Sequence, residues 1–107
     1  MIAVSDFIEI LVTLLPSDAG GRSSSIAPRN GTYRPFVRSA HGERARVRFL
    51  EGPPRIAPGD AALVVAEVES DADEVLVAGV ELDLIEPDGR LVGLATAVRL
   101  WRAAVSA

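Results

Sequence analysis

Apolar and polar residues alternate through most of the chain with the period of a β-strand. The clearest case is residues 44–50, where Ala45, Val47 and Phe49 alternate with arginines. Successive side chains of a strand point to opposite faces, so this pattern gives one buried face and one solvated face. The same pattern, bounded by Gly- and Pro-rich turns, predicts six strands, at residues 7–15, 33–38, 44–50, 61–68, 75–85 and 91–101.

Residues within these ranges refine the prediction. Pro35 cannot donate a ladder hydrogen bond, which places the second strand at an edge or a bulge. Residues 61–68 are apolar on both faces, which favours a central strand, and the fifth strand is expected to break near Gly79. Trp101 is expected to plug or cap the core. In the first strand, one face is expected to carry Ile8, Ile10, Val12 and Leu14. In the last strand, one face is expected to carry Val92, Leu94, Val98 and Leu100.

The segments between the strands contain turn residues. Pro58-Gly59-Asp60 and Pro87-Asp88-Gly89-Arg90 are typical of tight turns, whereas residues 17–32 form a long loop rich in Gly, Ser, Pro and Asn. No amphipathic helix is evident. The prediction is an all-β chain of one domain, residues 1–107, folded as a six-stranded antiparallel closed β-barrel, with a sandwich as the alternative. Closure would hide the edges of the sheet.

Charge is distributed unevenly along the chain, although the net charge is only −4. Residues 20–55 hold eight arginines against two acids, a balance of +6, whereas residues 56–107 have a balance of −7. If the fold keeps these parts on separate faces, the molecule is electrically two-sided and suits an electrostatically steered partner.

Several short motifs occur in an order that resembles a known family. They are Phe7 followed by Leu14-Leu15, then Gly20-Gly21-Arg22, Gly31-x-Tyr33-Arg34-Pro35-x-Val37-Arg38, Ile56-x-Pro58-Gly59-Asp60 and Gly89-Arg90-x-Val92-Gly93. Together they resemble the C-terminal β-barrel domain (domain 3) of elongation factor Tu and related translational GTPases. The resemblance implies a six-stranded barrel. In the full-length factors this domain takes part in binding aminoacyl-tRNA and nucleotide-exchange partners.

The chain also departs from that family. It contains no GxxxxGK[ST] phosphate loop, so it is not itself an elongation factor. Glu81, Asp83 and Glu86 stand where the family's last hairpin carries arginines. Acidic side chains there would repel a phosphate backbone.

An arginine-rich strand is the main candidate for chemistry. Arg44, Arg46 and Arg48 lie on one strand face, spaced by roughly 7 Å, which suits successive phosphates or a row of carboxylates. The alternative is a solvated outer face whose charges prevent aggregation. The full candidate set for binding a partner or RNA is Arg22, Arg34, Arg38, Arg44, Arg46 and Arg48.

No catalytic or metal-binding set is predicted. The chain has no cysteine, and its one histidine, His41, lies in an expected hairpin turn away from Ser23–Ser25. The acidic residues 71–74 lack the glycine and distal glutamate of a calcium loop. Glu81 and Asp83 share a face, as an acid/base pair would, but are expected to be solvated. We therefore expect no cofactor.

The expected function is that of a non-enzymatic protein-interaction module, with the translation machinery as the first place to seek its unidentified partner. RNA binding through the six arginines is the alternative, and an enzyme using Ser23–Ser25 or the acid pair is the third. The N-terminal residues 1–16 lack a basic region and a cleavage site. We therefore expect a cytoplasmic protein that does not bind membranes and is a monomer or a weak homo-oligomer.

Overall fold

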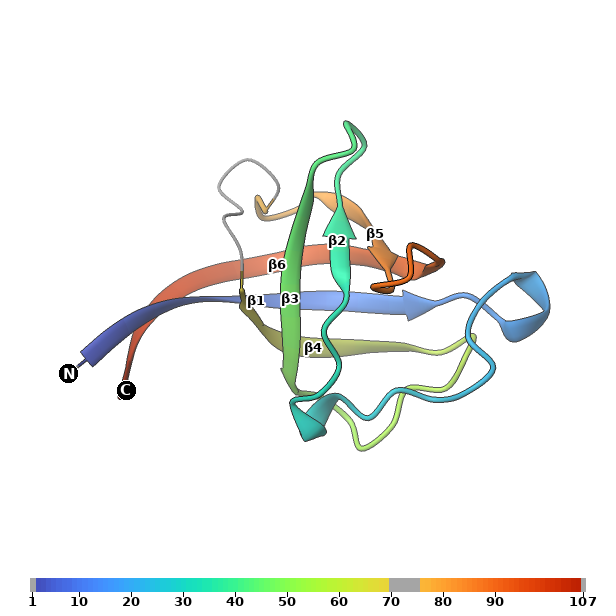
Figure 1. Cartoon of the computed structure of the whole chain (residues 1–107), viewed down its shortest axis with the longest axis horizontal. Coiled ribbons are helices and arrows are strands. Elements are labelled where there is room, and N and C mark those ends of the chain that lie inside the picture. The colour runs from blue at the N-terminus through green and yellow to red at the C-terminus, as the bar shows by residue number, and fades with distance from the viewer. Residues whose placement is uncertain (1, 70–75, 107) are drawn as a thin grey trace.

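The computed structural model is a closed antiparallel barrel of six strands, as predicted from the sequence (Figure 1). The structure describes residues 2–69 and 76–106. Around the barrel the strand order is β1-β4-β3-β2-β5-β6. The strands are β1 (Ile2–Leu14), β2 (Phe36–Arg38), β3 (Arg44–Glu51), β4 (Ala61–Val68), β5 (Glu81–Ile85) and β6 (Leu91–Ser106). Two 3-10 turns, η1 (Ser17–Ala19) and η2 (Pro28–Asn30), lie in the long loop between β1 and β2.

Alternate residues of the strands fill the barrel. In β3, Ala45, Val47 and Phe49 are buried, and the arginines between them point outward. The first strand behaves in the same way, because its even-numbered residues from 8 to 14 are all buried. These faces confirm the alternation read from the sequence, and their burial supplies the main driving force for folding.

The last strand differs from its predicted pattern. Val92 is buried, but Leu94 on the same predicted face is 52% exposed. The cause is an extra residue where β6 pairs with β5, since Leu84 lies opposite Gly93 and Ile85 lies opposite Leu91. This extra residue turns the side chains that follow it to the other face. A second extra residue, Val98, restores the original alternation, because Ala97 lies opposite Ile10 and Arg99 lies opposite Glu9. The small residues of β6, not its large ones, therefore face the core.

Two predicted strands are shorter than expected. Only Phe36–Arg38 pairs on both sides, although the carbonyl oxygens of Tyr33 and Pro35 accept hydrogen bonds from β3. The fifth strand begins at Glu81, because Gly79 lies in a turn with φ +88°. The predicted start of that strand at Val75 lies outside the described residues.

Trp101 does not plug the core, contrary to the prediction. It lies opposite Phe7 on the outer face of the β1–β6 pair, where the two rings stack with centroids 5.8 Å apart. The guanidinium of Arg99 lies over the Trp101 ring, 4.6 Å from its centroid. The tryptophan thus stabilises the outer surface of these strands.

Candidate functional site

The strand order brings the basic and acidic parts of the sequence together. The basic strands β2 and β3 lie between β4 and β5, which carry acids. Two ion pairs cross these strand boundaries: Arg48 with Glu67 at 2.8 Å and Arg38 with Asp83 at 3.0 Å. A third joins Arg34, just before β2, to Glu69, just after β4, at 3.5 Å. The condition for a two-sided charge distribution is therefore not met at these strands, because opposite charges meet as neighbours on the barrel wall.

Arg44 and Arg46, which were predicted to share a strand face with Arg48, pack on an aromatic ring. The guanidiniums of Arg44 and Arg46 lie 5.2 and 4.9 Å from the centre of the Phe36 ring. Phe36 is the residue directly opposite Arg46 in the ladder of β2 and β3. Such contacts hold a cation at the surface without neutralising it. On this strand face, Arg44 is therefore solvated, whereas Arg48 is paired with an acid.

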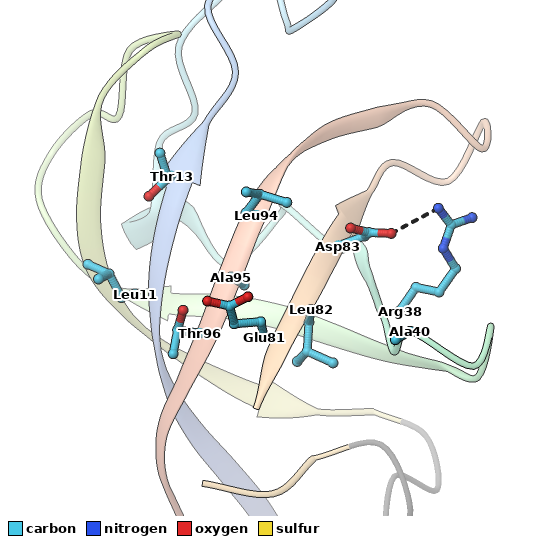
Figure 2. A pocket seen from close by; sticks show the side chains of 10 residues that line it. All are labelled: Leu11, Thr13, Arg38, Ala40, Glu81, Leu82, Asp83, Leu94, Ala95 and Thr96. Atoms are coloured by element: carbon cyan, nitrogen blue, oxygen red, sulfur yellow. Dashed lines mark hydrogen bonds and ion pairs between the residues drawn. The ribbon is translucent and has the colours of Figure 1, made fainter. Parts of the chain in front are cut away.

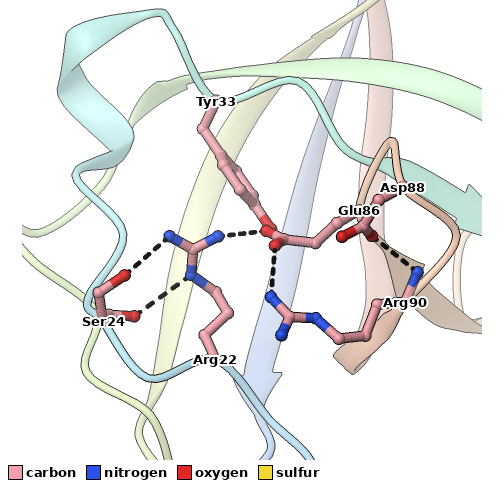
Figure 3. A network of polar contacts seen from close by, with 6 residues as sticks. All are labelled: Arg22, Ser24, Tyr33, Glu86, Asp88 and Arg90. Atoms are coloured by element: carbon pink, nitrogen blue, oxygen red, sulfur yellow. Dashed lines mark hydrogen bonds and ion pairs between the residues drawn. The ribbon is translucent and has the colours of Figure 1, made fainter.

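The sixth candidate, Arg22, belongs to a polar cluster at the turn after β5 (Figure 3). Its guanidinium forms an ion pair with Glu86, and the Tyr33 hydroxyl donates to the same carboxylate at 2.6 Å. Arg90 binds the other carboxylate oxygen at 3.3 Å. Arg22 also lies over the Tyr33 ring, 5.3 Å from its centre, and donates to Ser24 at 3.2 Å. Glu86 is only 8% exposed, so these bonds satisfy a nearly buried charge.

Burial also affects the tyrosine of the cluster. It raises the pKa of Tyr33, and the nearby Glu86 carboxylate raises that pKa further. The hydroxyl is therefore protonated at neutral pH and acts as a hydrogen-bond donor. Its ring packs edge-on against Phe49 of the core, with centroids 5.0 Å apart. The cluster joins the long loop to the barrel and leaves no unpaired group of its own for chemistry.

The cluster explains why the family-like motifs occur together. Three of these motifs lie far apart in the sequence, and each contributes one side chain to the cluster. These side chains, which meet at Glu86, are Arg22, Tyr33 and Arg90. A Cβ at Gly21 would lie 2.2 Å from the carbonyl oxygen of Leu15, so the loop can pass there only as glycine. From the sequence, Glu86 was expected only to repel phosphate, and its position at the centre of the cluster was not predicted.

A depression lies on the outer surface over β1, β5 and β6 (Figure 2). Its volume is about 440 Å³. The ion pair of Arg38 with Asp83 forms one wall, and Glu81, which has no partner among the residues the structure describes, stands at another. The apolar side chains that line it are Leu11, Leu82 and Leu94 with Ala40 and Ala95.

Large apolar side chains are exposed beside this depression. Leu11 of β1 lies directly opposite Leu63 of β4, and they are 41% and 53% exposed. Leu94 of β6, next to Thr13 on the other side of β1, completes this surface. We call Leu11, Leu63 and Leu94 the outer apolar patch. Residues 61–68 form a central strand as predicted, paired with β1 and β3, and their second apolar face, which includes Leu63, is directed to solvent.

The other predicted chemistry is not assembled. Ser24 is engaged by Arg22, and His41 lies in the turn between β2 and β3. Residues 71–74 lie outside the described part of the chain. Among residues 2–69 and 76–106, no group of three or more His, Cys, Asp or Glu side chains is placed to hold a metal ion. In that same part of the chain, no helix has the length and apolar character needed to cross a membrane.

Comparison with known proteins adds no assignment to this geometry. No model of a known protein family matches the chain, and no curated protein matches its sequence. The resemblance to the C-terminal domain of elongation factor Tu therefore stays a hypothesis based on the motifs.

Proposed function

We propose that this protein is a non-enzymatic protein-interaction module that binds its partner through the outer apolar patch and the adjoining depression. The observation that carries the proposal is the exposure of three leucines on three adjacent strands of a closed barrel, with Leu11 opposite Leu63 and Leu94 opposite Thr13, two residues from Leu11. A contiguous exposed apolar surface, rimmed by polar groups, is typical of a protein-binding site. Scattered single apolar residues would not carry the same meaning.

The energetics support a protein partner for this surface. Burying apolar surface contributes about 25 cal/mol for each Å² removed from water. The barrel interior is already filled, so Leu11, Leu63 and Leu94 gain such burial only from another molecule. A protruding side chain of the partner would enter the depression, where the carboxylate of Glu81 favours a cationic group. The motif resemblance makes the translation machinery the first place to seek that partner.

RNA binding has less support. Within the described residues, the candidate arginines Arg22, Arg34, Arg38 and Arg48 already pair with carboxylates of the chain. A phosphate would have to compete with those carboxylates, and their negative charge repels it. The pairs therefore reduce the net positive charge that an RNA backbone would meet.

The test uses two matched serine variants of exposed apolar residues. The tagged wild-type protein, the double variant Leu63→Ser/Leu94→Ser and the control Val77→Ser are used to isolate partners from cell extract. Val77 is 58% exposed but lies outside the patch, so its replacement should leave binding intact. A captured protein is then purified and titrated against the three variants. Direct binding that the double variant loses by at least about tenfold, and Val77→Ser retains, supports the proposal.

Two results would overturn the proposal. One is a purified partner that binds the double variant as tightly as the wild type. The other is selective tRNA binding at physiological salt that is lost on Arg44→Ala/Arg46→Ala/Arg48→Ala, because this would establish the RNA alternative.

A further inference from the structure

Strands β1 and β6 continue beyond the barrel as a two-stranded ribbon. Strand β1 pairs with β4 only from Asp6 onward, and β6 pairs with β5 only as far as Thr96. The two strands nevertheless pair with each other over the whole of β1, from Ile2 to Leu14. Figure 1 shows this ribbon projecting from the barrel at the end where both termini lie. A two-stranded ribbon is only marginally stable on its own in water.

The hydrogen-bond pattern shows which residues of β1 and β6 direct their main-chain groups toward each other and which direct them away. The N–H of Leu14 donates to Asp60 beside β4, and the N–H of Leu15 donates to Val92 of β6. Because successive residues of a strand bond to opposite sides, the odd-numbered residues of β1 face β6. In the register of the two strands these residues lie opposite Arg99, Trp101 and Ala103.

The residues between them on β6 therefore face the other way. Leu100, Arg102 and Ala104 direct their N–H and C=O groups to the outer edge of β6. No strand in residues 2–69 or 76–106 pairs with that edge beyond Ala97. Such a row of main-chain donors and acceptors is a template for adding another strand.

This edge lacks the usual protection against strand pairing. Natural edges are blocked by proline or by charges that project into the path of an incoming strand. Here Arg99 is held by Glu9 at 3.3 Å and Arg102 by Asp6 at 2.7 Å, so both cations are directed toward β1. The next two residues, Ala103 and Ala104, are small and uncharged.

We propose that two copies of this protein associate by antiparallel pairing of their β6 edges about a twofold axis. A second copy fits this edge because an antiparallel pairing of one strand with itself is self-complementary, so both copies satisfy their edge at once. Within each ribbon, Arg99 pairs with Glu9 and Arg102 pairs with Asp6. Because these charges are compensated, the arginines of the two copies do not repel each other strongly when the edges meet. The result is a four-stranded sheet built from two ribbons.

The side chains of the ribbon favour the same arrangement. Val4 lies opposite Ala104, and Leu100 lies four residues before Ala104 on the same face of β6, with the ion pair of Arg102 and Asp6 between them. Val4 is 61% exposed and Leu100 is 38% exposed. Pairing would join the apolar residues of both copies into one face of the four-stranded sheet. This surface is separate from the outer apolar patch, so the proposal does not depend on the proposed function.

Sedimentation velocity from about 10 µM to about 1 mM protein tests the association. The wild type is expected to shift from monomer to dimer as the concentration rises. Ala104→Pro removes an edge donor without touching a bond to β1, and it should weaken association by at least about tenfold. Ala104→Lys adds a charge at the edge and should weaken association without a change of backbone. Ala104→Ser keeps the donor and the small size, and should associate like the wild type.

Amide hydrogen exchange identifies the edge directly. At the highest concentration, exchange at Leu100 and Ala104 should be slower by about tenfold than in dilute protein. Exchange at Trp101 and Ala103 should change little, because these amides already bond to β1 in the monomer.

Three results would overturn the proposal. The first is a wild type that stays monomeric over the whole concentration range. The second is a dimer that is equally strong in Ala104→Pro and Ala104→Lys. The third is a dimer lost in Leu63→Ser/Leu94→Ser but kept in the Ala104 variants, which would place self-contact on the outer apolar patch.

Discussion

The two sides of the barrel wall satisfy their outward side chains in different ways. On the side formed by β2, β3 and their neighbours, arginines meet carboxylates across the strand boundaries. On the side formed by β4, β1 and β6, leucines face water with nothing in the described chain to cover them. Arg38 and Arg48 of the charged side are paired within one molecule, whereas the exposed leucines would be removed from water by binding another molecule. The comparison teaches that several of the conspicuous arginines are engaged within the molecule, whereas the less conspicuous leucines are the surface on which the proposed interaction depends.

Replacing Glu86 by alanine should have the largest effect on the charged side. Removing this nearly buried carboxylate leaves Arg22 and Tyr33 without their partner. We expect a loss of about 3 kcal/mol in the free energy of unfolding, because breaking a buried ion pair leaves a charge uncompensated. Urea unfolding followed by circular dichroism measures it.

The matched control for that experiment is Glu43→Ala. Glu43 is an exposed acid in the turn before β3, and its loss should cost less than about 0.5 kcal/mol. If the two variants are equally stable, the cluster at Glu86 does not anchor the long loop.

Tyr33→Phe should have an intermediate effect, of about 1 kcal/mol, because one hydrogen bond to Glu86 is lost. The variant should also change the alkaline pH dependence. Burial raises the pKa of Tyr33, so above about pH 10 the unfolded chain loses a proton that the folded protein keeps. Stability linked to Tyr33 is complete below that pH and falls as the pH rises beyond it.

This fall should be visible in urea midpoints measured between about pH 8 and about pH 11. It should be smaller in Tyr33→Phe than in the wild type. The chain has a single tyrosine, so no other phenol contributes. Identical curves for the two proteins would mean that the hydroxyl is solvated in the folded state.

The pair of Arg48 and Glu67 should contribute less, since both side chains are partly exposed. A double-mutant cycle with Arg48→Gln and Glu67→Gln is expected to give a coupling energy of about 0.5 kcal/mol that decreases with salt. The hydrogen bond from Arg48 lowers the pKa of Glu67. The coupling should therefore be complete above the ordinary pKa of glutamate, about 4.3, and be lost as the pH falls through the lower folded value. A coupling that persists in strong acid would contradict this assignment.

Leu63→Ser should have the smallest effect on stability, within about 0.5 kcal/mol, because the side chain is already in water. The neighbouring Val64 faces the core, and Val64→Ser should cost about 3 kcal/mol through lost packing and an added buried hydroxyl. Thermal unfolding of both variants checks this contrast. A large loss of stability in Leu63→Ser would show that the outer apolar patch is part of the fold and not an interface.

The sequence alone determined the strands and their buried faces wherever the alternation was uninterrupted, as in β1 and β3. Period two is a local property, so it needs no knowledge of the neighbouring strand. It failed in β6, because the extra residue opposite β5 depends on how two distant strands pair. The pattern did not decide the environment of Leu63, because an apolar residue on a strand looks the same in sequence whether its face meets the core or water.

The sequence also determined the composition of the charged side, with its arginines before residue 56 and its acids after. Only the tertiary structure decided that these charges neutralise one another, since barrel closure places β3 beside β4 and β2 beside β5. The same closure brings Arg22, Tyr33 and Arg90 to Glu86, and within the described residues it leaves the outer edge of β6 beyond Ala97 without a paired strand. The physical reason is common to all three: a local pattern fixes which way a side chain points, whereas its partner is fixed by the strand order.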